Sequence, residues 1–244
     1  MSLEKNLSNK FRFFIKAIKL SDNLVVINDI NIINQWQKVL RIKRGDSVFL
    51  INGQGQGRLF TLNDYKKNFA ELKSAGQLKK EDFRELEVCL YLSLLKRDNF
   101  ELAVQKAVEV GVIDICPVIS QRVVKTGWRR DRVEKIATEA LEQSGRLWLP
   151  NISEPISFDE ALEQSYTHGS IIIFDSRGFN IKDYKRQENE KRLNIFVGPE
   201  GGFSEEEFKK VQKYNPVVLS LSKQATLRAE TAAIVASYWA VNLL

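Results

Sequence analysis

The chain has 244 residues, of which 43% are hydrophobic and 28% charged, and its formal net charge is +6. This composition is that of a folded globular protein and excludes intrinsic disorder as the default state. No apolar run approaches the roughly 20 residues of a membrane span, and the N-terminal residues lack the apolar core of a secretory signal. We therefore expect a cytoplasmic protein that does not contact membranes.

Metal and disulfide chemistry have little support in the sequence. Cys89 and Cys116 both lie in apolar stretches and are expected to be small buried side chains rather than a disulfide framework. His168 is the only histidine and stands in a polar turn, so we expect an exposed loop residue without a catalytic role. A zinc site that needs two imidazole ligands is excluded, and we expect no bound metal.

The N-terminal third of the chain is basic. Residues 1–80 contain 15 lysine and arginine residues against 6 acidic ones, whereas the remainder contains 22 against 25. This asymmetry favours contact of one domain with a polyanion, and nucleic acid is the leading candidate. A solvated, lysine-rich surface without a partner explains the charge alone equally well.

The same region is predicted to form a small β-rich domain, with its boundary after residue 77. Apolar runs separated by turn residues predict strands over 24–27, 47–51 and 58–62. A short helix is predicted over 32–40, because Ile33, Trp36, Val39 and Leu40 recur at helical spacing. The polar and charged residues 74–77 and 79–82 are predicted to be a linker.

From residue 78 to the end, predicted strands alternate with predicted helices, which indicates an α/β domain with a largely parallel sheet. The predicted strands cover 87–95, 112–119, 170–174, 193–197 and 217–221. The predicted helices begin at Asn99, at Arg129, after the capping box of Ser204 and Glu207, and at Ala229. The last helix is apolar nearly all round, so a subunit interface is a reasonable cover for it.

Three loops that follow these strands carry unusual residues: 175–178, 198–204 and 222–228. Ligands of open parallel sheets bind beyond the carboxyl ends of the strands, where such loops meet. We predict a pocket lined by backbone groups, with Glu200, Arg228 and Glu230 as its charged members. The loop with three glycines matches neither common nucleotide-binding motif, and a tight strand-to-helix connection without a ligand is the alternative.

Taken together, two strings carry a resemblance to a known family. Residues 194–207 contain Gly-Pro-Glu-Gly-Gly after a strand, and residues 219–232 contain Leu-Arg-Ala-Glu-Thr-Ala. This pair at this spacing resembles the RsmE family, the 16S ribosomal RNA uracil-N3 methyltransferases of the SPOUT superfamily, and the likeness extends over nearly the whole chain. One departure is that Ser222 replaces a family glycine, in a loop one residue longer than usual.

The resemblance implies a PUA-like β-barrel RNA-binding domain over 1–77 and a SPOUT trefoil-knot α/β methyltransferase domain over 78–244. It implies a homodimer through the knot and the C-terminal helix, acting on 16S rRNA of the 30S subunit, with S-adenosylmethionine bent in the knot. The cofactor-binding residues expected on this basis are Phe174, Gly198, Pro199, Glu200, Gly201, Gly202, Leu221, Ser222, Thr226, Leu227 and Arg228.

Methylation of uracil N3 requires loss of the N3 proton. We expect Arg228 to stabilise the resulting anion as a catalytic residue, with Glu200 as a proton acceptor or orienting group and Glu230 in a structural role. The expected RNA phosphate contacts are Arg12, Lys38, Arg41, Lys43, Arg44, Lys96, Arg97 and Arg122. Two alternatives stay open: methylation of a ribose 2′-hydroxyl or another base, and a non-catalytic RNA-binding or ribosome-assembly protein.

Overall fold

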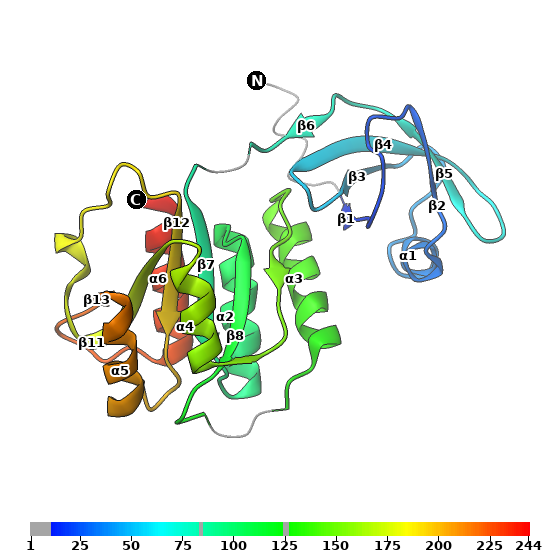
Figure 1. Cartoon of the computed structure of the whole chain (residues 1–244). Helices are drawn as coiled ribbons and strands as arrows, with labels where there is room; N and C mark the ends of the chain where they lie inside the picture. Colours follow the sequence, from blue (N-terminus) through cyan, green and yellow to red (C-terminus); the bar gives the residue numbers. More distant parts are fainter. Residues whose placement is uncertain (1–10, 83–84, 124–126) are drawn as a thin grey trace. The chain divides into compact units, whose positions relative to one another are not determined.

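The computed structural model describes residues 11–82, 85–123 and 127–244, which divide into two compact units (Figure 1). Of the described residues, the first unit holds 11–82 together with Leu141–Leu149, and the second holds 85–123, 127–140 and 150–244. No helix in these described ranges is long and apolar enough to cross a membrane.

A six-stranded sheet forms the first unit. Its strand order is β1 (Arg12–Phe14), β3 (Ser47–Ile51), β4 (Gln56–Tyr65), β5 (Ala70–Ser74), β2 (Leu24–Ile27), with β6 (Lys79–Lys80) paired to β4. The strands predicted over 47–51 and 58–62 pair as a β3–β4 hairpin, and all pairs are antiparallel except β1 with β3. Residues 79–80 form β6 rather than part of a linker, because they pair with Gln56 and Gly57.

The helical segment of the first unit changes its winding halfway. α1 (Ile30–Asn34) continues into the π-helical turn η1 (Gln35–Val39), where the Leu40 amide donates to the Gln35 carbonyl over 2.9 Å. Of the residues that recur at helical spacing, Trp36 is fully buried, whereas Val39 is 71% exposed. A π-helical turn contains more residues than an α-helical turn, so Val39 does not lie on the same face of the helix as Trp36, as it would in a regular helix.

The segment 141–149 joins the first unit through Glu81. A side-chain oxygen of Glu81 accepts the Leu147 amide over 2.7 Å, and its carbonyl accepts the Trp148 indole N–H over 2.8 Å. The Arg146 guanidinium pairs with the same carboxylate at 3.0 Å. Together with backbone bonds of Leu147 and Leu149 to Gly55 and Gly53, these contacts hold a segment distant in sequence in this unit.

The second unit is built on a seven-stranded sheet whose recorded pairs are all parallel, as predicted. The path is β10 (Ile156–Ser157), β8 (Asp114–Ile119), β7 (Glu87–Ser93), β12 (Arg192–Val197), β11 (Ser170–Asn180), β13 (Val217–Ser220), with β9 (Asn151–Ile152) paired to β8. Its helices are α2 (Arg97–Val110), α3 (Arg130–Ser144), α4 (Phe158–Tyr166), α5 (Glu205–Val211) and α6 (Ala229–Asn242), with 3-10 turns η2 (Ile181–Asp183) and η3 (Gln212–Tyr214).

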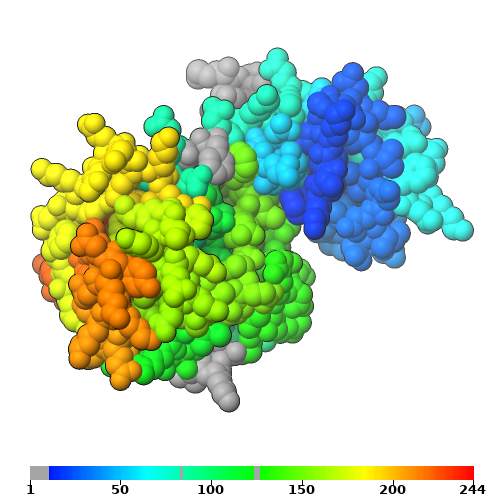
Figure 2. All heavy atoms as spheres, in the orientation of Figure 1, coloured from blue at the N-terminus to red at the C-terminus, as the bar shows by residue number. Residues whose placement is uncertain are grey.

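The sheet lies between two helical layers, with α2 and α6 on one face and α4 and α5 on the other (Figure 1). In Figure 2, α4 (yellow-green) and α5 (orange) lie side by side on the outer surface. Lys210 of α5 forms an ion pair with Asp159 of α4 at 2.6 Å. Cys89 and Cys116 are free and buried in the core beneath α4, as predicted. Burial raises the pKa of both thiols, which makes them unreactive packing groups.

Helix limits differ from the predicted ones at two places. α2 begins at Arg97, ahead of the predicted start at Asn99, and its buried residues form a stripe from Phe100 to Val108. α4 was not predicted, although Ser157 and Glu160 form the same capping box that marks α5. The missed helix is only nine residues long, so its apolar period is short and easily overlooked.

Candidate active site

A cavity of about 400 Å³ lies where the carboxyl ends of β11, β12 and β13 meet. This volume falls in the range of small-molecule binding sites. Ten of the eleven predicted cofactor residues line it, and Arg228 does not. The remaining lining residues are Arg122, Asp175, Ser176, Arg177, Val197, Phe203, Glu205, Ala225, Ala229 and Ala232.

The glycine loop, residues 198–203, forms one wall of the cavity. Gly202 has φ of +66°, a left-handed conformation that favours glycine, and its amide closes a turn onto the Pro199 carbonyl at 2.8 Å. A Cβ at Gly198 would lie 3.2 Å from the Phe203 nitrogen, so a side chain there would press on the turn. The loop therefore offers backbone groups, and few side chains, to a ligand.

A second wall comes from a bulge in β11. Phe174 and Phe179 both pair with Leu219 of β13, so the pairing register shifts and the four residues between them form the bulge. A Cβ at Gly178 would stand 2.5 Å from the Val218 carbonyl carbon, which means that only glycine allows β13 to pass so closely. The bulge carries Asp175, Ser176 and Arg177 to the cavity.

The third wall is the loop from Leu221 to Leu227. The Ser222 hydroxyl accepts the Gln224 and Ala225 amides at 3.3 and 3.1 Å, and Lys223 Nζ donates to the Gly178 carbonyl. Ser222 therefore fixes this loop through a local side-chain turn.

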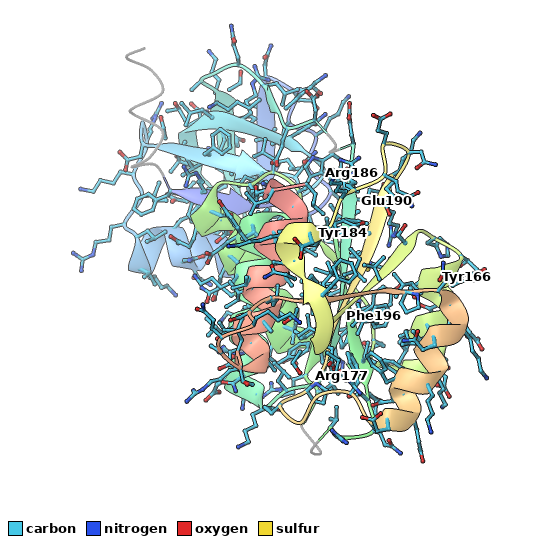
Figure 3. All side chains as sticks on the ribbon, turned by 90° about the vertical axis from the view of Figure 1, so that its left-hand side faces the viewer. Tyr166, Arg177, Tyr184, Arg186, Glu190 and Phe196 are labelled. Carbon is cyan, nitrogen blue, oxygen red and sulfur yellow. The ribbon has the colours of Figure 1, made fainter. Side chains whose placement is uncertain are left out.

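Arg177 is the most heavily paired charge of the cavity. Its guanidinium donates to both oxygens of Asp175 at 2.8 and 2.9 Å and to Glu205 at 2.8 Å, and it stacks on the Phe208 ring at 3.7 Å. Figure 3 shows it at the opposite end of the unit from Arg186 and Glu190. Burial would raise the pKa of Asp175, but the hydrogen bonds from Arg177 outweigh burial and lower that pKa overall.

Arg122 was predicted as an RNA phosphate contact, and the structure places it in the cavity wall, where its Nη1 donates to the Gly201 carbonyl over 2.7 Å. Its neighbour Gln121 donates its backbone N–H to Glu207 Oε1 over 2.7 Å. The loop after β8 is thereby joined to the glycine loop and to the start of α5.

The predicted catalytic residues occupy different positions. Glu200 is exposed at the cavity, and its Oε1 accepts the Lys96 amide at 3.3 Å. Arg228 is the exposed N-cap residue of α6, between the lining residues Leu227 and Ala229. Glu230 is buried in the first turn of α6, and its Oε2 has no hydrogen-bond partner among the described residues. Their catalytic roles stay predictions.

The other predicted RNA contacts lie on both units. In the first unit, Lys38, Arg41, Lys43 and Arg44 are exposed on η1 and the turn after it. Arg12 is half-buried in β1, where its Nη1 donates to the Gln143 carbonyl at 3.5 Å.

In the second unit, Lys96 and Arg97 lie at the start of α2, where Arg97 pairs with Glu101 at 3.1 Å. Within the described part of the chain, no group of three or more His, Cys, Asp or Glu side chains is placed to hold a metal ion.

Glu207 is expected to be a key support of the cavity. It is buried, and its two oxygens accept the Ser204 amide at 2.8 Å and the Gln121 amide at 2.7 Å. A Glu207→Ala variant leaves both donors unpaired, so we expect a loss of about 2–3 kcal/mol in the free energy of unfolding. Urea denaturation measures this loss.

The matched control is Glu160→Ala, which removes the same capping box from α4 but no bond to another loop. A smaller loss is expected for it, and equal losses for the two variants would contradict the supporting role of Glu207.

A parallel sheet covered by helices, with a backbone-lined cavity at the carboxyl ends of its strands, is typical of α/β domains that bind a small molecule at that edge. A family model described as an RNA methyltransferase domain matches residues 83–241, and the chain therefore belongs to that family. The resemblance to the RsmE methyltransferases drawn from the two strings is confirmed.

Named relatives cover most of the chain. A ribosomal RNA small subunit methyltransferase E from Rickettsia conorii is 28% identical over 236 residues, which are 92% of each chain. One from Synechocystis sp. is 30% identical over 82% of this chain and 67% of its own. The crystal structure of such an enzyme from Neisseria gonorrhoeae bound to S-adenosyl methionine is 29% identical, with a TM-score of 0.82 over 94% of this chain and 95% of that one.

Proposed function

We propose that this chain transfers a methyl group from S-adenosylmethionine to N3 of a uracil in 16S ribosomal RNA of the small subunit. The observation that carries the proposal is the single cavity that the glycine loop, the β11 bulge and the 221–227 loop form together. The small-subunit methyltransferase from Neisseria gonorrhoeae, similar over 94% of this chain, has been crystallised with this cofactor.

The lining suits the cofactor. Phe174, Val197, Leu221 and Leu227 supply apolar surface for an adenosyl group, and residues 198–202 supply backbone donors and acceptors. Bound there, S-adenosylmethionine supplies an electrophilic methyl group on a positively charged sulfur. We propose that these residues, with Thr226 and Ser222, hold it.

The protein's own contribution is positioning and charge. Uracil N3 carries a proton, and Glu200 at the cavity is the proposed acceptor, because a carboxylate is a base that the cavity presents to solvent. Arg228 is proposed to stabilise negative charge on a uracil carbonyl oxygen as the proton leaves. N3 lies on the Watson–Crick edge, so the target must be unpaired or turned out of its stack.

The basic residues of both units are the proposed phosphate contacts. A methyltransferase of ribosomal RNA works where subunits assemble, so we propose a cytoplasmic location. The family relationship also leads us to propose that the first unit is PUA-like and that the chain of the second unit is knotted around the cavity.

The direct test is methylation of 30S particles and of naked 16S rRNA with labelled cofactor, followed by mass spectrometry of the nucleosides. We expect 3-methyluridine at one position. A 2′-O-methylated nucleoside or another methylated base would show that the enzyme methylates a different atom from the one proposed. RNA binding without methylation of either substrate would favour a non-catalytic protein.

We also propose that the protein is a homodimer through α6. Val235 and Tyr238 are 40% and 51% exposed on this C-terminal helix, and its C-cap residue Leu243 is 64% exposed, although the other face of the helix packs on α2 and the sheet. Such an apolar surface on a helix already buried on one side is typical of a subunit interface.

Tyr238→Glu is expected to weaken the dimer about 30-fold or more, because a carboxylate would be buried without a partner in the interface. Sedimentation equilibrium measures the dissociation constant. Tyr166→Glu is the control, since Tyr166 is 61% exposed on α4, away from the proposed interface. A wild-type protein that is monomeric at micromolar concentrations would contradict the dimer.

A further inference from the structure

Two guanidinium groups line the cavity, and their charges are balanced very differently. Arg177 donates to Asp175 through two nitrogens and to Glu205 through a third, so carboxylates outnumber it. An anionic ligand would have to displace these carboxylates from Arg177, or it would be repelled by the net negative charge of the three groups together. Arg177 is therefore a structural cation of the β11 bulge.

Arg122 has no such partner. Its recorded hydrogen bond goes to the neutral Gly201 carbonyl, and no ion pair to it occurs within residues 11–82, 85–123 and 127–244. A guanidinium has five N–H donors, of which one carbonyl satisfies one. The remaining donors lie in the wall of a cavity that small molecules can enter.

The position of this group is fixed before any ligand arrives. The loop after β8 is held to α5 by two bonds, from the Gln121 amide to Glu207 at 2.7 Å and from the Gln121 side chain to Glu206 at 3.0 Å. A Cβ at Gly201 would lie 3.5 Å from Arg122 Cδ, so the arginine stem packs directly on the glycine loop. A preorganised arginine loses less entropy when it pairs with an anion.

We propose that Arg122 binds an oxyanion of a ligand inside this cavity, as the cavity's uncompensated cation. The planar guanidinium suits a carboxylate or a phosphate, which it pairs through two parallel hydrogen bonds. Within the proposed function, on which this inference rests, the oxyanion is either the carboxylate of the methyl donor or a phosphate of the RNA strand that enters the cavity.

Calorimetry with two cofactor forms distinguishes these sources. S-adenosylmethionine and its decarboxylated form share the adenosyl and sulfonium groups and differ in the carboxylate. If the ligand group is the carboxylate, Arg122→Gln lowers the affinity for S-adenosylmethionine about tenfold. Its affinity for the decarboxylated form stays within twofold of the wild-type value. For a phosphate ligand, both cofactor forms bind normally, and KM for RNA rises about tenfold with kcat little changed.

Arg122→Lys keeps the charge without the planar fork and should recover part of whichever affinity is lost. Lys135→Gln removes a positive charge from the exposed face of α3, outside the cavity, and should leave all values unchanged. A loss that is equal for both cofactor forms would show that Arg122 only supports the glycine loop, and it would overturn the proposal.

The proposal would also be overturned if Arg122→Gln changed neither the affinity for S-adenosylmethionine nor KM for RNA by more than twofold. Failure of the proposed function looks different, because then wild-type protein itself binds no S-adenosylmethionine and methylates no RNA.

Discussion

Ala232→Phe is expected to weaken S-adenosylmethionine binding by roughly 100-fold or more while the protein stays folded. Ala232 lies in the second turn of α6 and lines the cavity with a single methyl group. A phenyl ring carried by this helix would project into space that is open in the structure, so it would compete with the ligand without overpacking a closed core. Calorimetry measures the affinity, and thermal unfolding checks the fold.

Ala232→Ser is the matched control, because it changes polarity at the same position with little change in volume. Its cofactor affinity should stay within about threefold of wild type. Unchanged cofactor binding in a folded Ala232→Phe protein would mean that the methyl donor binds elsewhere.

Arg228→Ala is expected to lower kcat about 10²–10³-fold while cofactor affinity changes less than about threefold. The Arg228 side chain is exposed at the start of α6, and it does not line the cavity where the cofactor is proposed to bind. Its backbone carbonyl accepts the Ala232 amide at 2.8 Å, a bond that alanine also provides, so α6 should be preserved.

Single-turnover methylation measures the chemical step of this variant. Arg228→Lys should restore part of the rate, because the charge remains, and Lys213→Ala on η3, outside the cavity, serves as a control for loss of surface charge. Full turnover by Arg228→Ala would refute the catalytic assignment. A loss of cofactor binding equal to the loss of rate would make Arg228 a binding residue instead.

The cavity was largely predictable because parallel strands bring their carboxyl ends to one edge. Three loops separated by tens of residues were expected to meet for this reason, and the lining residues Phe174, Gly198 and Leu227 do meet. Apolar residues at helical spacing also form the buried stripes of α2 and α3, including Val104 and Ala140.

Other features depend on tertiary contacts that periodicity does not contain. Arg122 is held at the cavity by contacts between distant segments, among them the bond from the Gln121 amide to Glu207, which is already the partner of a helix cap. A regular helix was predicted over 32–40, but the π turn at η1 changes the winding and leaves Val39 exposed.

The central claim is that the glycine loop and the 221–227 loop enclose one methyl donor. A crystal structure of the protein with S-adenosylmethionine tests it most directly. The predicted result is density for the adenosyl group between residues 198–202 and Leu221–Leu227. Density elsewhere, or a cavity left empty at saturating cofactor, would contradict the claim.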